Sequence, residues 1–191
     1  MIAALRSLWA CLSAAAATDD PLQQAGARIA LFAGSGQPLY PLGLVWIIGD
    51  AGWVARVAWL TTPFFLLVPF LGRWPVAGRL LLGLAGTFVT LYVALALGPA
   101  SAVEAYHLPV LLVGLLLFRK EERLAQIITL AMPLGALVWV RHAGPMGVES
   151  AGQLALIHWV GALGLSAYIV FVSYSARKHG RGRIATGQGF G

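Results

Sequence analysis

Two ionisable residues, Glu104 and His107, have the spacing that brings side chains together on a helix. They are three positions apart, so they share one face if a helix begins at Glu104. A carboxylate beside an imidazole stabilises the protonated ring, which is one way to build a proton or cation site. An interfacial salt-bridge or capping cluster is the alternative interpretation. The predicted ligand- or proton-sensing residues are Glu104, His107, His142, Glu149 and His158.

His158 raises the question of haem binding, because it lies inside an apolar run. A b-type haem needs two axial histidines at matched depth on facing helices, and His107 or His142 would have to supply the second ligand. No segment carries two histidines at the separation of stacked haems, so a hydrogen-bonded packing histidine is the preferred interpretation. We predict no cofactor and no metal; haem, a pigment or a bound lipid are the alternatives.

The common catalytic motifs are absent from the sequence. It contains no Gly-rich phosphate loop, no nucleophile elbow and no His-Glu-x-x-His sequence. Its single cysteine, Cys11, excludes an internal disulfide. We therefore predict that the chain is not an enzyme.

The composition indicates whether the surface of the protein faces water or lipid. Of 191 residues, 59% are hydrophobic and only 10% are charged, whereas a soluble domain carries about 25% charged residues. The mean hydropathy is +0.81. Most of the surface must therefore face lipid. The formal net charge of +6 resides at the ends of apolar runs rather than in a basic patch with interleaved aromatic residues, so nucleic-acid binding is not expected.

Apolar runs of about 20 residues, bounded by charges or turn residues, predict the membrane spans. The fold class is predicted to be all-α: a polytopic membrane bundle of about six transmembrane helices. The weakest run should be broken near Pro38, since it contains Gly34, Gly36 and Pro41. The six predicted spans are 29–48, 57–71, 80–97, 108–118, 124–140 and 154–174.

The distribution of arginine and lysine predicts the orientation, because cytoplasmic loops are enriched in both. Basic residues follow alternate spans: Arg73 and Arg79 after the second, residues 119–123 after the fourth, and residues 177–183 after the sixth. The intervening loops are poor in Lys and Arg. Both termini are therefore predicted to lie in the cytoplasm. The run 119–123 mixes signs and is interpreted as a solvated turn with local ion pairs.

Two segments flank the predicted six-helix domain of residues 21–176. Residues 1–20 have the composition of a helix lying in the headgroup plane, with a secretory signal as the alternative, and Asp19, Asp20 and Pro21 should separate this helix from the next. Residues 177–191 form a basic, Gly-rich cytoplasmic tail that should be disordered unless a partner or headgroups hold it. Its predicted contact residues are Arg177, Lys178, Arg181 and Arg183.

Residues 80–141 resemble a known bacterial membrane module. An outer loop, residues 98–104, ends in an acidic residue; Leu108 and Pro109 begin a span; and residues 118–123 form a short charged inner turn. This order is similar to the six-span modules found N-terminal to class III nucleotide cyclases, diguanylate cyclases and some histidine kinases. The resemblance implies signal reception at the outer face. It departs from these modules in that only a short basic tail follows the last span.

Together, these observations predict a non-catalytic accessory or structural subunit. It would be a multi-pass protein of the bacterial inner membrane that packs against other subunits of an energy-transducing or signalling complex. A six-helix sensor module with an outer-face site is one alternative. A small transporter is another; the broken first span favours it, and the lack of an inverted repeat argues against it.

Overall fold

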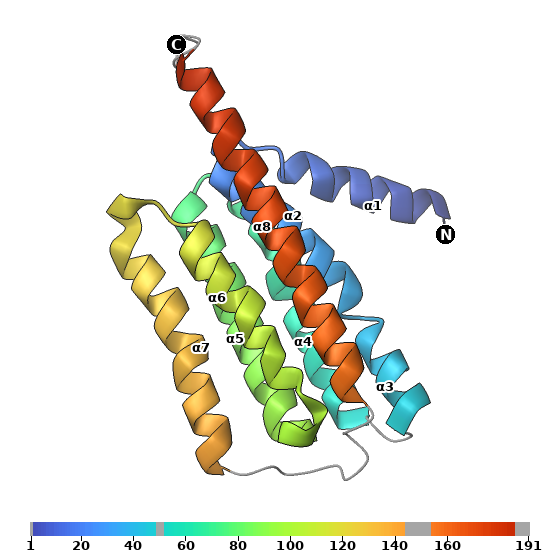
Figure 1. Ribbon diagram of the computed structural model, residues 1–191. Coiled ribbons are helices and arrows are strands. Elements are labelled where there is room, and N and C mark those ends of the chain that lie inside the picture. The colour runs from blue at the N-terminus through green and yellow to red at the C-terminus, as the bar shows by residue number, and fades with distance from the viewer. Residues whose placement is uncertain (1, 49–51, 144–153, 186–191) are drawn as a thin grey trace.

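The computed structural model describes residues 2–48, 52–143 and 154–185, and the regular secondary structure in these ranges is helical (Figure 1). No strand occurs in these three ranges. Eight α-helices are assigned there: α1 (Ile2–Ala15), α2 (Pro21–Gly36), α3 (Tyr40–Ile48), α4 (Gly52–Leu67), α5 (Pro75–Leu97), α6 (His107–Leu116), α7 (Arg123–Ala143) and α8 (Ala155–Ala185). Four 3-10 turns connect them: η1 (Val68–Leu71), η2 (Pro99–Ser101), η3 (Val103–Tyr106) and η4 (Lys120–Glu122).

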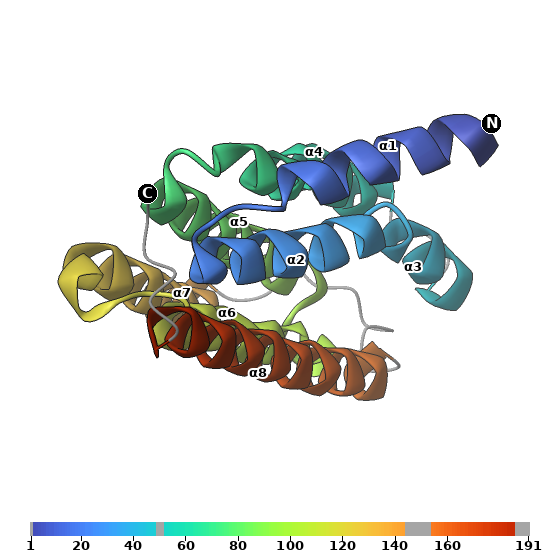
Figure 2. The same ribbon diagram turned by 90° about the horizontal axis from the view of Figure 1, so that it is seen from above.

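The helices from α2 to α8 run back and forth along a common direction, whereas α1 projects sideways from one end of the bundle (Figure 1). Viewed from above, they form a bundle in which α6 packs against both α7 and α8 (Figure 2). Helix α5 packs against α2, α4, α6 and α7, so it is the central element. We call the end that holds the start of α2, the start of α5 and the α6–α7 turn the charged end, and the opposite one the far end.

Helices α7 and α8 have largely apolar outer surfaces. Half of the most apolar window of α5 is buried, against 22% for α7 and 28% for α8. Leu124 on α7 and Leu156 on α8 are about three-quarters exposed, at 74% and 75%. Exposing this much apolar surface to water is unfavourable, so these helices must face lipid or another protein.

Within the described ranges, three helices are long and apolar enough to cross a membrane: Pro75–Leu97, Lys120–His142 and Ala155–Lys178. The other three predicted spans are interrupted or short. The break expected near Pro38 is present, because α2 ends at Gly36 and α3 begins at Tyr40. The remaining two are the shorter apolar helices Ala58–Leu71 and Val103–Leu116.

The boundary between α1 and α2 is confirmed. Helix α1 ends at Ala15, and α2 begins at Pro21, where proline is well suited to the first helical position. The Asp20 side chain caps α2 by accepting hydrogen bonds from the backbone N–H groups of Leu22 and Gln23, at 2.9 and 3.3 Å.

Close contact between α5 and α7 depends on Gly83. A Cβ atom at this position would clash with the side chain of Thr129 on α7. Thr129 is fully buried, and its hydroxyl donates to the Ala125 carbonyl of its own helix at 2.8 Å. The small residue therefore lets the two helices pack at short range, as is common between membrane helices.

Helix α8 continues through residues 177–185 of the predicted basic tail and ends at Ala185, so no helix boundary marks the predicted start of the tail. The expectation that this tail is disordered unless a partner or headgroups hold it stays a prediction. The Arg177 guanidinium donates to the Leu116 carbonyl at the C-terminal end of α6, at 2.8 Å. This bond satisfies one of the free carbonyl groups at the end of α6 and attaches the extension to the bundle.

Candidate functional site

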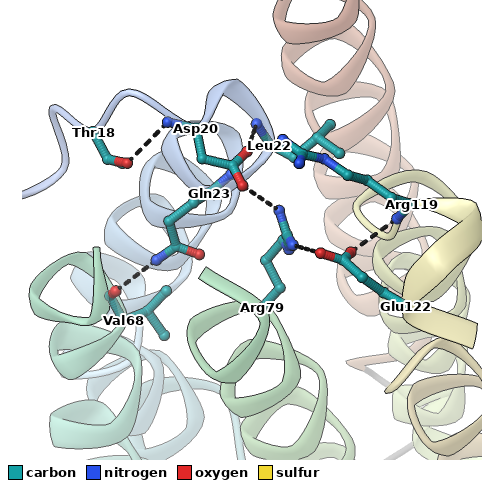
Figure 3. A network of polar contacts seen from close by, with 8 residues as sticks. All are labelled: Thr18, Asp20, Leu22, Gln23, Val68, Arg79, Arg119 and Glu122. Carbon is teal, nitrogen blue, oxygen red and sulfur yellow. Dashed lines mark hydrogen bonds and ion pairs between the residues drawn. The ribbon is translucent and has the colours of Figure 1, made fainter. Parts of the chain in front are cut away.

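The most extensive polar cluster lies at the charged end and centres on Arg79 of α5 (Figure 3). The Arg79 side chain is fully buried. Its Nη1 donates to Asp20 Oδ2 at 3.2 Å, and its Nη2 donates to Glu122 Oε1. One guanidinium therefore joins α2, α5 and the α6–α7 turn.

Asp20 contributes to this cluster in two ways. It caps α2, and it also pairs through Oδ1 with Nη2 of Arg119 at 3.2 Å. A carboxylate at a helix N-terminus is stabilised by the helix dipole as well as by hydrogen bonds. Asp20 therefore fixes the start of α2 and connects it to two cations from distant parts of the chain.

Glu122 corrects the interpretation of the 119–123 run. Its Oε2 accepts a hydrogen bond from the Arg119 backbone N–H at 2.9 Å, which is the local contact expected of a turn. Its other oxygen, however, pairs with buried Arg79 from α5. The turn is therefore attached to the bundle. The prediction missed this contact because helix spacing describes only neighbours along the chain.

The charges of this cluster balance, with two guanidinium groups facing two carboxylates. Burying a guanidinium is costly unless charged hydrogen bonds compensate it, and Arg79 has two. The ring of Phe118 adds a cation–π contact, with the guanidinium carbon 5.8 Å from the ring centroid. A substrate could not reach the buried and paired Arg79 guanidinium unless these ion pairs broke. The arrangement of this cluster is therefore suited to holding the three elements together.

Gln23 extends the polar network toward α4. Its Nε2 donates to the Val68 carbonyl of η1 at 3.1 Å, and the side chain is fully buried (Figure 3). A Cβ at Gly78 would meet the Gln23 amide group 2.5 Å away, so a larger residue there would force the Gln23 side chain to move. Side chains from α2, α5 and the α6–α7 turn, with the Val68 carbonyl of η1, therefore join four elements at the charged end.

A second polar cluster lies toward the far end and centres on His158 of α8. The Nδ1 atom of the buried ring is 2.7 Å from the Ser101 carbonyl, and its Nε2 is 3.0 Å from the Tyr40 hydroxyl. A carbonyl only accepts, so Nδ1 carries the proton, and the Tyr40 hydroxyl donates to Nε2 of the neutral ring. Both ring nitrogens are therefore engaged, as expected for a hydrogen-bonded packing histidine.

His158 stabilises an irregular stretch of backbone. Between α5 and α6, Gly98 and Ala102 adopt positive φ angles of 75° and 56°. The Ser101 hydroxyl donates to the Gly98 carbonyl at 2.7 Å and accepts from the Val103 N–H at 3.3 Å. Together with His158, these bonds satisfy polar groups that regular helix would have paired internally.

The predicted pair Glu104 and His107 lies on one helical stretch. Glu104 is in the 3-10 turn η3, which leads directly into helix α6 at His107. His107 is buried, and neither ring nitrogen has a hydrogen-bond partner among the described residues. No ion pair joins it to the half-buried Glu104 within the same ranges.

The other predicted site residues are not brought together. His142 is exposed, and its Nδ1 donates to the Val138 carbonyl of its own helix at 2.8 Å. Glu149 lies outside the described residues. On α8, Lys178 is exposed, and the side chains of Arg181 and Arg183 lie outside the described part. No group of three or more His, Cys, Asp or Glu residues that could hold a metal ion occurs in the described part of the chain.

No protein-family model matches the chain, and no curated protein and no solved structure matches it either. The geometry of the two polar clusters and of the apolar surface must therefore carry the functional argument.

Proposed function

We propose that the chain is a non-catalytic, multi-pass subunit of a bacterial inner membrane that packs against other membrane proteins. The observation that carries this proposal is the contrast between interior and surface. The buried ionic groups of the charged end bind one another, whereas the outward faces of α7 and α8 are largely apolar between their charged ends. Such a molecule is better suited to packing its apolar faces against other membrane proteins than to catalysing a reaction.

Six spans fit the path of the chain. Helices α5, α7 and α8 supply three. The others come from α2–α3, which has a break, and from the continuous stretches α4–η1 and η3–α6, each partly in 3-10 geometry. Interrupted spans are tolerated when protein buries the irregular backbone, which the Ser101–His158 contacts achieve for η2 and η3. Cations in alternate connections support a cytoplasmic location for the charged end and for both termini.

Reporter fusions test this topology. Fusions after residue 122 and after residue 178 should report the cytoplasm, and a fusion after residue 150 should report the opposite side. Export of the reporter fused after residue 122 would overturn the proposed orientation, because the Arg79 cluster would then face the periplasm.

Partner binding is tested by purifying the full chain in a gentle detergent and identifying co-purifying proteins by mass spectrometry. We expect partner subunits at fixed stoichiometry. Truncation after Tyr174 should release them, because it removes the Arg177 contact and the basic end of α8. Truncation after Ala185 is the matched control and should retain them. A chain that purifies alone and monodisperse from native membranes contradicts the proposal.

A sensor module is the second candidate, and buried His107 favours it. A neutral imidazole without a hydrogen-bond partner is costly to bury, and such groups often mark functional sites. A sensor should respond to external pH or a ligand. His107→Phe should abolish that response while preserving the fold, and Glu104→Gln should weaken it. An unchanged response in both variants removes this candidate.

A further inference from the structure

A cleft of about 340 Å³ lies between α1, α2 and α8. The outward side of α2 forms its largest wall, and Tyr168 of α8 faces this wall. The end of α1 and the residues that follow it close the third side. The lining residues are Ser13, Ala16, Ala17, Gln24, Arg28, Leu31, Phe32, Ser35 and Tyr168.

Arg28 is the only cation lining this cleft. It is exposed, and no described residue forms a hydrogen bond or ion pair with it. Arg79, by contrast, is fully buried and fully charge-balanced. Arg28 therefore has five N–H donors available to a partner that the protein does not itself supply.

The position of Arg28 defines the kind of partner. It follows the helix cap Asp20 by eight residues, which places it about 12 Å along α2 from the charged end. At that depth, in a membrane-embedded molecule, an unpaired guanidinium needs an anion or a path to water. Guanidinium groups bind phosphate with paired hydrogen bonds, and the amide of Gln24 adds a further donor one turn away.

The cleft is amphipathic, which distinguishes it from a simple anion site. Beyond Arg28, its wall includes Leu31 and the rings of Phe32 and Tyr168, which are tilted by 32° with centroids 4.7 Å apart. A hydrocarbon chain can pack on this surface, whereas an inorganic ion gains nothing from it. Anionic lipids are also concentrated in the leaflet that the cationic end of the protein would face.

We propose that this cleft binds one anionic phospholipid, with the phosphate on Arg28 and an acyl chain along Phe32 and Tyr168. The inference rests on the proposed membrane location and does not depend on any protein partner. Bound in this way, the lipid joins α1 to the α2–α8 pair and fills a space that no side chain occupies.

Native mass spectrometry of the full chain, released from detergent after addition of phosphatidylglycerol or phosphatidylcholine, tests the proposal. The wild type should retain one phosphatidylglycerol and little phosphatidylcholine. Arg28→Gln should weaken phosphatidylglycerol retention about tenfold, the effect expected for one charge-assisted contact. Arg73→Gln removes the same charge from an exposed loop outside the cleft and should leave retention unchanged.

Three outcomes would overturn the inference. Equal losses in Arg28→Gln and Arg73→Gln would show general charge attraction. Displacement of the lipid by inorganic phosphate at equal concentration would show an anion site without a role for the acyl chain. If Arg28→Gln fails to fold, Ala17→Trp, which obstructs the cleft from an exposed position, provides the test, and unchanged retention in that variant refutes the site. None of these results changes whether the protein needs detergent to stay in solution. They can therefore be distinguished from a failure of the proposed membrane location.

Discussion

Replacing Arg79 with methionine should destabilise the protein more than any other single removal of charge at the charged end. Methionine keeps an unbranched side chain that can replace the aliphatic part of arginine but leaves Asp20 and Glu122 without their shared cation. Removing one partner of a buried ion pair costs about 3–5 kcal/mol. Both carboxylates retain some exposure, with 15% and 14% of their side chains accessible, so we expect the lower part of that range.

Thermal unfolding of the purified protein in detergent, followed by circular dichroism, measures this effect. For a chain of this size, a loss of about 3 kcal/mol corresponds to a fall in Tm of roughly 6–12 °C. Arg119→Ala is the matched control, because Arg119 binds the same carboxylate of Asp20 but is half exposed. Exposed ion pairs contribute about 0–1 kcal/mol, so Tm should change by only a few degrees.

A double variant separates the lost charge pair from general disruption. Arg79→Met combined with Glu122→Gln removes a cation and an anion together, so it should be more stable than Arg79→Met alone. The reasoning is refuted if Arg79→Met and Arg119→Ala lower Tm equally. It is also refuted if the second substitution makes Arg79→Met still less stable.

Three further predictions use the same unfolding measurement. Gly83→Leu should lower the free energy of unfolding by about 1–3 kcal/mol, because the larger side chain forces α5 away from α7. Gly135→Leu, where a Cβ meets nothing within 4 Å, should lower it much less, and equal losses in the two variants would contradict close packing at Gly83. His158→Ala should lower the free energy of unfolding by about 1–3 kcal/mol, because it leaves the buried Ser101 carbonyl unpaired, and Tyr40→Phe should lower it by about 1 kcal/mol. A larger loss for Tyr40→Phe would contradict the greater importance of the bond between His158 and Ser101. Asp20→Asn should retain the cap of α2 but lose its ion pairs, so it should lie between the wild type and Asp20→Ala.

The helices were predictable because each depends on its own stretch of sequence. Long apolar runs without interruption became α5, α7 and α8, and Pro38 with its neighbouring glycines marked the break between α2 and α3. Asp20 followed by Pro21 is a recognisable helix start, and the structure has it there. These features follow from local backbone preferences and from the length of apolar runs.

The polar contacts were not predictable in the same way. Arg79 was counted as a loop cation, although it lies inside the first turns of α5 and meets residues 59 and 43 positions away in the chain. Two features of the sequence could have identified the role of Arg79. It is followed immediately by an apolar run, and acidic residues lie in two other connections that were predicted to be on the cytoplasmic side. Similarly, Ser101 showed no pattern, because its partner His158 is 57 residues away.

The Arg79 cluster also constrains the order in which this protein can assemble. During synthesis Asp20 and Arg79 are made before Glu122, so Arg79 at first has only one of its two carboxylate partners. The ion pair that joins α5 to the α6–α7 turn can form only after the chain has been made as far as Glu122.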